Sequence, residues 1–171
     1  MIELKKVNLD DIENKWNFYK NIPKDENGFT NSHHNISKED FIIILKEMID
    51  HSNGINLPNK YVPYTEYYLY ENSEIIGLFR LRHKINDFMT EINTGHIGYY
   101  IKPEKRKQGY ATIGLKLLID LSKNIIEEDF LQAGAFKSNI ASIKTLEKCG
   151  FKTFKTTENK VLKRLIIKNA E

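Results

Sequence analysis

The chain has 171 residues, of which 40% are hydrophobic and 29% are charged, values that are ordinary for a globular protein and exclude a wholly disordered chain. Its formal net charge is only +3, without a block of like charges, so the composition gives no indication of a nucleic-acid partner. We therefore expect a single domain spanning residues 1–171.

Neither a disulfide nor a membrane span is expected. The chain has one cysteine, Cys149, so no intramolecular disulfide can form. The longest apolar run in the first half, residues 41–45, is far shorter than the ~20 residues that span a bilayer. No secretory signal is visible at the N-terminus. The sequence thus predicts a cytoplasmic protein without a membrane partner.

The first sixty residues read as one strand followed by two helices. Ile2–Val7 alternates apolar and polar residues, which predicts a strand, and Asn8 is positioned to cap a helix over Leu9–Tyr19. Lys24–Asn35 reads as a polar loop. Ser37 begins a capping-box pattern, which predicts a second helix that continues to about Asp50.

A hairpin and a third strand are expected next. Tyr64–Tyr70 and Glu74–Ile85 read as paired strands around a tight turn. Asn86–Thr94 reads as a loop. His96–Lys102 reads as the third strand, which Pro103 ends.

The C-terminal half alternates helices and strands. A helix begins near Tyr110 and is followed by a buried strand over Phe130–Phe136. A shorter helix over Asn139–Lys148 follows, and the last two strands are expected over Phe151–Thr156 and Lys160–Ile167. The resulting order, β-α-α-β-β-β-α-β-α-β-β, is a mixed α/β arrangement.

The segment 95–112, GHIGYYIKPEKRKQGYAT, carries the clearest indication of chemistry. A basic turn joins a strand to a helix, and the unpaired amides at a helix N-terminus favour anionic phosphates. Gly109 permits close approach of the backbone, and Ala111 keeps the first helical turn open. No GxxxxGK[ST] or GxGxxG pattern is present, so on spacing alone an ordinary strand-to-helix turn remains open.

Two segments resemble the GNAT superfamily of N-acetyltransferases. Residues 106–111, RKQGYA, match its R/Q-x-x-G-x-G/A signature, and the NIAS of 139–142 with the LEKCGF of 146–151 is similar to its second conserved segment. The resemblance covers roughly residues 64–167. It implies a GNAT-like fold, with a mostly antiparallel sheet of about six to seven strands that splays between residues 96–102 and 130–136, flanked by about four helices.

The resemblance also implies acetyl-CoA as co-substrate and no metal. The signature loop would hold the diphosphate, the strand before it would pair with the pantetheine arm, and the next helix would contact the pantetheine or the adenosine. The cofactor-binding residues implied in this way are Tyr100, Ile101, Arg106, Lys107, Gln108, Gly109, Tyr110, Ala111, Thr112, Asn139 and Ser142.

The catalytic groups are less clearly indicated. His96 stands where related sequences often carry Glu, and a histidine titrates near neutrality, so His96 is a candidate general base. Glu91 or a water held by the backbone competes for that role. Leu146 occupies the position of the tyrosine that protonates the departing thiolate in many members, so the general acid is not assigned.

The acceptor is expected to be an amine of a small molecule, a peptide or a protein, and a homodimer is a candidate assembly. Residues between Asn8 and Pro63 should determine the acceptor. Some residues of the tyrosine cluster should line its pocket, and Asp25 and Glu26 are candidates to attract a cationic amine. The missing tyrosine leaves an alternative, a non-catalytic acyl-CoA sensor.

Overall fold

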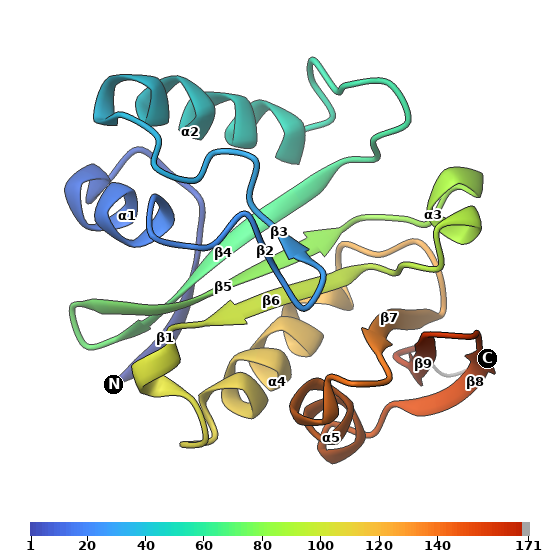
Figure 1. Ribbon diagram of the computed structural model, residues 1–171. Helices are drawn as coiled ribbons and strands as arrows, with labels where there is room; N and C mark the ends of the chain where they lie inside the picture. The colour runs from blue at the N-terminus through green and yellow to red at the C-terminus, as the bar shows by residue number, and fades with distance from the viewer. Residues whose placement is uncertain (169–171) are drawn as a thin grey trace.

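The computed structural model describes residues 1–168, which form two small sheets and the helices that cover them (Figure 1). The order of the main elements confirms the mixed α/β expectation. The elements are β1 (Ile2–Lys6), α1 (Ile12–Tyr19), β2 (Asp25–Glu26), β3 (Phe29–Thr30), α2 (Lys38–Ser52), β4 (Tyr64–Glu71), β5 (Glu74–Arg82), α3 (Asp87–Glu91), β6 (Ile97–Ile101), the 3-10 turn η1 (Pro103–Lys105), α4 (Tyr110–Ser122), β7 (Phe130–Phe136), α5 (Ile140–Lys148), β8 (Lys152–Thr156) and β9 (Lys160–Ile166).

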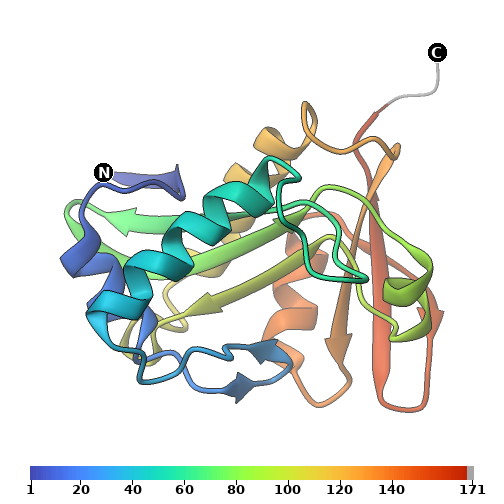
Figure 2. The ribbon, with the colours of Figure 1, turned by 90° about the horizontal axis from the view of Figure 1, so that it is seen from above.

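The larger sheet has the order β1-β4-β5-β6 and is antiparallel throughout. Helices α1 and α2 lie on one of its faces and α4 lies on the other (Figures 1 and 2). Side chains alternate between these faces along β4. Tyr67 and Leu69 join the core beneath α4, whereas Tyr68 and Tyr70 join the core beneath α1 and α2.

The second sheet has the order β7-β9-β8 and is also antiparallel. Its backbone is hydrogen-bonded to that of the segment leading into β6 where the N–H of His96 donates to the carbonyl of Gln132 at 2.8 Å. Beyond that contact β6 and β7 are not paired along their length. The expected splay between residues 96–102 and 130–136 is thereby confirmed, and it opens a gap between the two sheets.

Three local expectations were wrong. The first helix begins at Ile12, after Asp11 in the left-handed region, and the Asn8 side chain instead accepts the N–H of Asp10 at 3.0 Å. The polar segment 24–35 contains the β2–β3 hairpin, and the segment 86–94 contains α3. The N-cap of α3 is Asn86, whose side chain accepts the N–H of Met89 at 2.9 Å.

The second helix follows the predicted capping chemistry. Ser37 is its N-cap, and the hydroxyl oxygen accepts the N–H of Asp40 at 3.1 Å. Its buried face, which includes Phe41, Leu45 and Met48, packs against β4. Within residues 1–168, no helix combines the length and the apolar character needed to cross a membrane.

Candidate functional site

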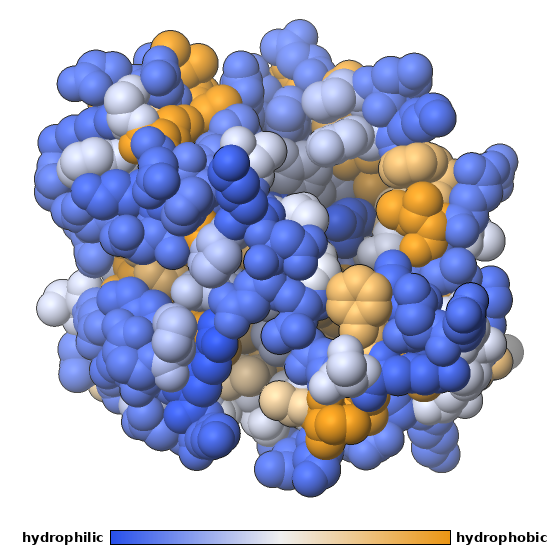
Figure 3. Space-filling model, viewed as in Figure 1, coloured by the Kyte–Doolittle hydropathy of each residue, from blue (hydrophilic) through white to orange (hydrophobic). Residues whose placement is uncertain are grey.

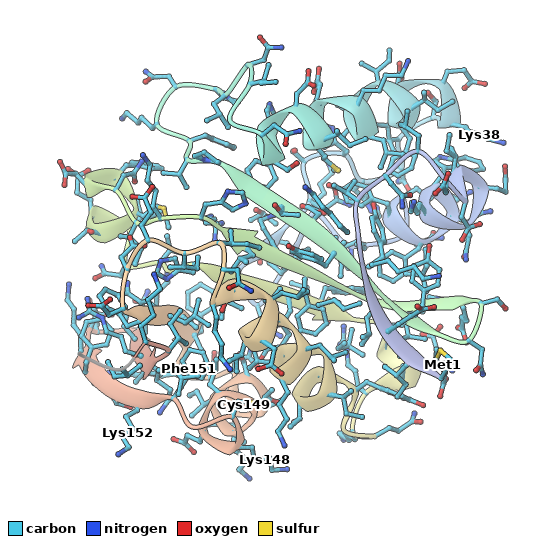
Figure 4. All side chains as sticks on the ribbon, turned by 180° about the vertical axis from the view of Figure 1, so that it is seen from behind. Met1, Lys38, Lys148, Cys149, Phe151 and Lys152 are labelled. Atoms are coloured by element: carbon cyan, nitrogen blue, oxygen red, sulfur yellow. The ribbon has the colours of Figure 1, made fainter. Side chains whose placement is uncertain are left out.

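A groove of about 460 Å³ follows the gap between β6 and β7. Its walls come from β6, the turn before α4, the first turn of α4, β7 and α5, and the β2–β3 hairpin forms one rim. Figure 3 shows that the surface seen in the view of Figure 1 is hollowed near its middle. Figure 4 shows the opposite side, where Lys148 and Lys152 lie at the outer edge of the molecule while Phe151 is buried.

The turn before α4 presents a run of free backbone amides to this groove. Lys107 and Gly109 both have positive φ, at 60° and 86°, a conformation that turns successive N–H groups toward one side. Among residues 1–168, no group accepts a hydrogen bond from the amides of residues 107–112, and the first engaged amide is that of Ile113, which donates to Gly109 at 3.1 Å. A Cβ added to Gly109 would meet no atom within 4 Å, so the space above the turn is open. The turn is therefore a ready anion cradle.

Arg106 fixes the shape of this turn. Its Nε donates to the carbonyl of Ile101 at 2.9 Å, and its Nη1 lies 2.5 Å from Glu26 on the β2–β3 hairpin. The hydrogen bond with Glu26 raises the pKa of Arg106. The resulting ion pair ties the hairpin to the turn, and it occupies Glu26, which the sequence had suggested for a cationic amine.

Most of the residues implied by the resemblance are brought together. Tyr100, Ile101, Arg106, Lys107, Gly109, Tyr110, Ala111, Thr112, Asn139 and Ser142 all line the groove. Gln108 does not line it, because its side chain folds back and donates to the carbonyl of Glu104 at 3.0 Å. The Gln108 amide nevertheless belongs to the free run in the turn.

His96 does not reach the groove. Its side chain has 0% exposure, and Nδ1 accepts the backbone N–H of Gln132 at 3.0 Å. Nε2 lies 3.3 Å from a carboxylate oxygen of Glu128. Burial lowers the pKa of the His96 imidazole. A buried ring that joins the two sheets has no path to a substrate amine, so its position argues against the general-base prediction. The competing Glu91 is exposed at the end of α3 and lines neither cavity.

Leu146 lines the groove, and it is 1% exposed within the core. One turn earlier on α5, the Ser142 hydroxyl lies 2.9 Å from the hydroxyl of Tyr99 on β6. The Tyr99 ring stacks on Phe79, with centroids 5.5 Å apart. This contact joins β6 to α5 and supports the wall of the groove that contains Leu146.

A second cavity, of about 360 Å³, lies between α2, α3 and the face of β4 and β5. It shares Thr30, Arg80, Arg82 and Thr94 with the groove, so the two cavities meet at these residues. Tyr61 and Tyr64 line it, as expected of part of the tyrosine cluster, whereas Tyr67, Tyr68 and Tyr70 are buried in the two cores.

Two charged residues of β5 were missed from the sequence. Arg80 and Arg82 interrupt an otherwise apolar strand at a spacing of two, which places both on one face of the sheet. Arg80 donates two hydrogen bonds to Glu66, the residue opposite it on β4, at 2.9 and 2.6 Å. Arg82 donates to the carbonyl of Gly95 at 3.0 Å. The interruption of the apolar pattern was the available indication.

Comparison with solved structures identifies the fold. RimJ of Mycobacterium smegmatis in complex with CoA-disulfide is similar at a TM-score of 0.72 and 13% identity, over 96% of this chain and 81% of that chain. A GNAT-family acetyltransferase from Streptococcus pneumoniae has a TM-score of 0.66 at 14% identity, over 98% and 100%. The N-acetyltransferase PseH of Campylobacter jejuni, in complex with acetyl coenzyme A, has a TM-score of 0.60 at 17% identity, over 97% and 99%.

Sequence comparison gives the family. No curated protein matches the chain significantly. A family model described as an acetyltransferase (GNAT) domain matches residues 8–152, which is most of the chain. These residues include every residue that lines the groove except Lys160. The chain therefore belongs to the GNAT acetyltransferase family.

Proposed function

We propose that this protein is an acetyl-CoA-dependent N-acetyltransferase that transfers the acetyl group directly to a primary amine. The observation that carries the proposal is the run of unengaged amides at residues 107–112, which opens into a groove between two splayed strands. A diphosphate supplies the acceptor oxygens that such a run lacks. The neighbouring cations Lys105, Arg106 and Lys107 line the same groove and suit an anionic ligand.

The edge of β6 that faces β7 suits the pantetheine arm. Beyond the His96–Gln132 contact, no strand of residues 1–168 pairs with this edge. Backbone groups near Tyr100 and Ile101, apart from the Ile101 carbonyl that accepts from Arg106, are therefore available to pair with the amides of the arm. Asn139 and Ser142 line the opposite wall from α5. The thioester would then lie toward the junction with the second cavity, which would receive the amine.

The transfer needs a neutral amine nitrogen. The nitrogen attacks the thioester carbonyl, a C–N bond forms, the C–S bond breaks, and the nitrogen loses a proton while the CoA thiolate gains one. Arg80 is neutralised by Glu66, but Arg82, also at the junction of the cavities, disfavours the ammonium form and so lowers the pKa of a bound amine. We propose that water accepts its proton. A thiol with a pKa of about 8.5 is a tolerable leaving group without a dedicated acid.

Binding of acetyl-CoA tests this proposal most directly. We expect Gly109→Val to weaken the calorimetric affinity for acetyl-CoA at least about 10-fold, because a side chain would fill the open space above the turn and strain a residue at φ 86°. Gly54→Val is the matched control, because Gly54 has φ 74° but lines neither cavity. Wild-type protein that does not bind acetyl-CoA at millimolar concentration would refute the proposal.

A non-catalytic acyl-CoA sensor is the second candidate, and it is favoured only by Leu146 at the usual tyrosine position. It predicts the same binding of acetyl-CoA without thiol release across a broad panel of amines. A cytoplasmic location, a homodimer and a single domain over residues 1–171 remain predictions, and residues 169–171 of that domain lie outside the described part of the chain.

A further inference from the structure

The charges that line the second cavity do not cancel. The carboxylates, lysines and arginines that line it are Glu47, Lys60, Glu66, Arg80 and Arg82. Glu47 and Lys60 are exposed, and their formal charges sum to zero. Glu66 and Arg80 form a hydrogen-bonded pair at the floor, with side chains 1% and 16% exposed. Arg82 is left as one unbalanced cation.

Arg82 is partly buried and has no counter-ion in the described part of the chain. Among residues 1–168, no carboxylate lies within ion-pair distance of its guanidinium, and its one hydrogen bond goes to the neutral carbonyl of Gly95. Burial, followed by repulsion from Arg80, lowers the pKa of Arg82 to about 10. A partly buried cation without a counter-ion is stabilised by a nearby anion. The missing anion can come from a ligand, because Arg82 lines both cavities.

The rest of the cavity narrows the choice of ligand. Its volume of about 360 Å³ suits a small molecule. Ile44, Met48, Val62, Phe88 and Met89 give it an apolar wall. One unbalanced charge matches a carboxylate, since a phosphate monoester carries nearly two charges at neutral pH. The fork of the guanidinium also fits a carboxylate geometrically.

We propose that the acceptor is a small primary amine that also carries one carboxylate and an apolar side group, and that Arg82 binds this carboxylate. The inference rests on the proposed acetyl transfer and adds its substrate class. The carboxylate holds the molecule at the junction of the two cavities, where its amine meets the thioester. A polyamine has no group for Arg82 and is repelled by it.

Matched pairs of amines test the substrate class. Acetyl-CoA binding is first verified by calorimetry, so that failure of the proposed function is recognised separately. Thiol release is then measured with leucine, methionine and phenylalanine, with the amide of each, and with spermidine and a short uncharged peptide. We expect kcat/KM for the acids to exceed that for their amides by about 10- to 100-fold. The amine of each amide loses its proton more easily than the amine of the acid. A site that did not bind the carboxylate would therefore favour the amides.

Variants of Arg82 assign the preference to this residue. We expect Arg82→Gln to reduce the acid-to-amide ratio to within about 3-fold of unity and Arg82→Lys to retain part of it. Lys84 is exposed, lies two residues from Arg82 and lines neither cavity, so Lys84→Gln is the control and should keep the acid-to-amide ratio of the wild type. If Arg82→Gln does not fold, the wild-type ratio and Arg82→Lys still decide the question.

Several results would overturn the inference while leaving acetyl transfer intact. These are equal rates for acids and amides in the wild type, a preference for spermidine or the peptide, and an equal loss for acid and amide in Arg82→Gln. If no amine releases thiol, calorimetric titration of leucine, methionine and phenylalanine into the CoA-loaded protein replaces the rate measurement, and the absence of binding refutes the inference.

Discussion

His96 and Gln132 join the two sheets through two hydrogen bonds. The backbone N–H of His96 donates to the carbonyl of Gln132 at 2.8 Å, and the backbone N–H of Gln132 donates to Nδ1 of the His96 ring at 3.0 Å. The pair stands where β6 and β7 begin to diverge. It therefore sets the apex of the groove, and these contacts indicate a structural contribution of His96 to the site.

Replacing His96 should reduce stability far more than turnover. In His96→Ala the buried N–H of Gln132 loses its acceptor and a cavity remains, so we expect a loss of about 2–4 kcal/mol in the free energy of unfolding. His96→Asn, which retains an acceptor atom, should recover part of that loss. Denaturant unfolding measures the first quantity. A general base at His96 would instead show as a loss of kcat by orders of magnitude in both variants while each remains folded.

The stability of the protein should fall as the pH falls below neutrality. Burial lowers the pKa of His96 in the folded state, so below about pH 6.5 the unfolded chain takes up a proton that the folded protein does not. Stability is then complete above the unfolded pKa and is lost as the pH falls toward the folded pKa. Burial lowers the pKa of His83 as well, so some dependence remains in His96→Asn.

The contribution of His96 is measured by denaturant unfolding of the wild type and of His96→Asn at several pH values between about 5 and 8, which gives the pH dependence of the free energy of unfolding of each protein. Glu128 acts in the same direction at lower pH. Burial raises the pKa of its carboxyl, but the N–H of Ile85 and the neighbouring His96 outweigh burial and leave it lowered. Identical pH profiles for the two proteins would contradict the assignment to His96.

Gly95 should tolerate no side chain, because its backbone lies against the backbone of Gln132 and Ala133. A Cβ on Gly95 would lie 2.2 Å from the carbonyl oxygen of Gln132, whereas a Cβ on Gly98 would meet only Phe29, at 3.7 Å. We expect Gly95→Ala to lower the free energy of unfolding by about 1–3 kcal/mol and to weaken acetyl-CoA binding by widening the apex. Gly98→Ala is the control and should leave stability within about 0.5 kcal/mol. Equal effects of the two substitutions would contradict this account.

Glu26 and Arg106 should affect acetyl-CoA affinity in opposite directions. Arg106→Ala removes a cation and the support of Ile101, so we expect binding to weaken about 10-fold. Glu26→Gln removes a carboxylate from the rim of an anion site and should strengthen binding by about 2- to 5-fold. Since both side chains are partly exposed, the free energy of unfolding should change by less than about 1 kcal/mol in Glu26→Gln. Calorimetry at two salt concentrations measures both effects, and weakening by both variants would refute the prediction.

Tyr99 and Ser142 should prove energetically coupled. Their hydroxyls lie 2.9 Å apart and join β6 to α5. We expect Tyr99→Phe and Ser142→Ala to destabilise the protein by about 0.5–1.5 kcal/mol each, with the double variant losing about 1 kcal/mol less than the sum. Denaturant unfolding of the wild type, the two single variants and the double variant completes this double-mutant cycle. Additive losses would show that the two groups do not interact.

Local rules predicted the parts of the fold whose residues act on their neighbours in sequence. Ser37 was recognised as a cap because its hydroxyl needs only Asp40 nearby. Gly109 was recognised because a strand, a basic turn and a helix follow one another. Asn8 was wrong as a cap because Lys15, which donates to the carbonyls of Asn8 and Asp10, holds that segment in a different turn.

The second cavity could not be predicted in this way, because its residues are distant in sequence. Arg80 meets Glu66 only through the register of β4 and β5, and Arg82 meets Gly95 only through the pairing of β5 with β6. His96 shows the same limit. Its residue type suits proton transfer, but the contact with Gln132, 36 positions along the chain, determines where its ring lies.

The splay of the sheet also bears on self-association. An unpaired strand edge normally invites strands of other chains, which is a route to aggregation. Here the free edges of β6 and β7 face each other, and one end is closed by His96 and Gln132 while the β2–β3 hairpin borders the groove. A long foreign strand therefore finds no straight, open run of backbone. At these two inner edges, peptide groups stay accessible to a slender ligand and are shielded from another polypeptide, whereas the outer edge strands β1 and β8 lie outside this arrangement.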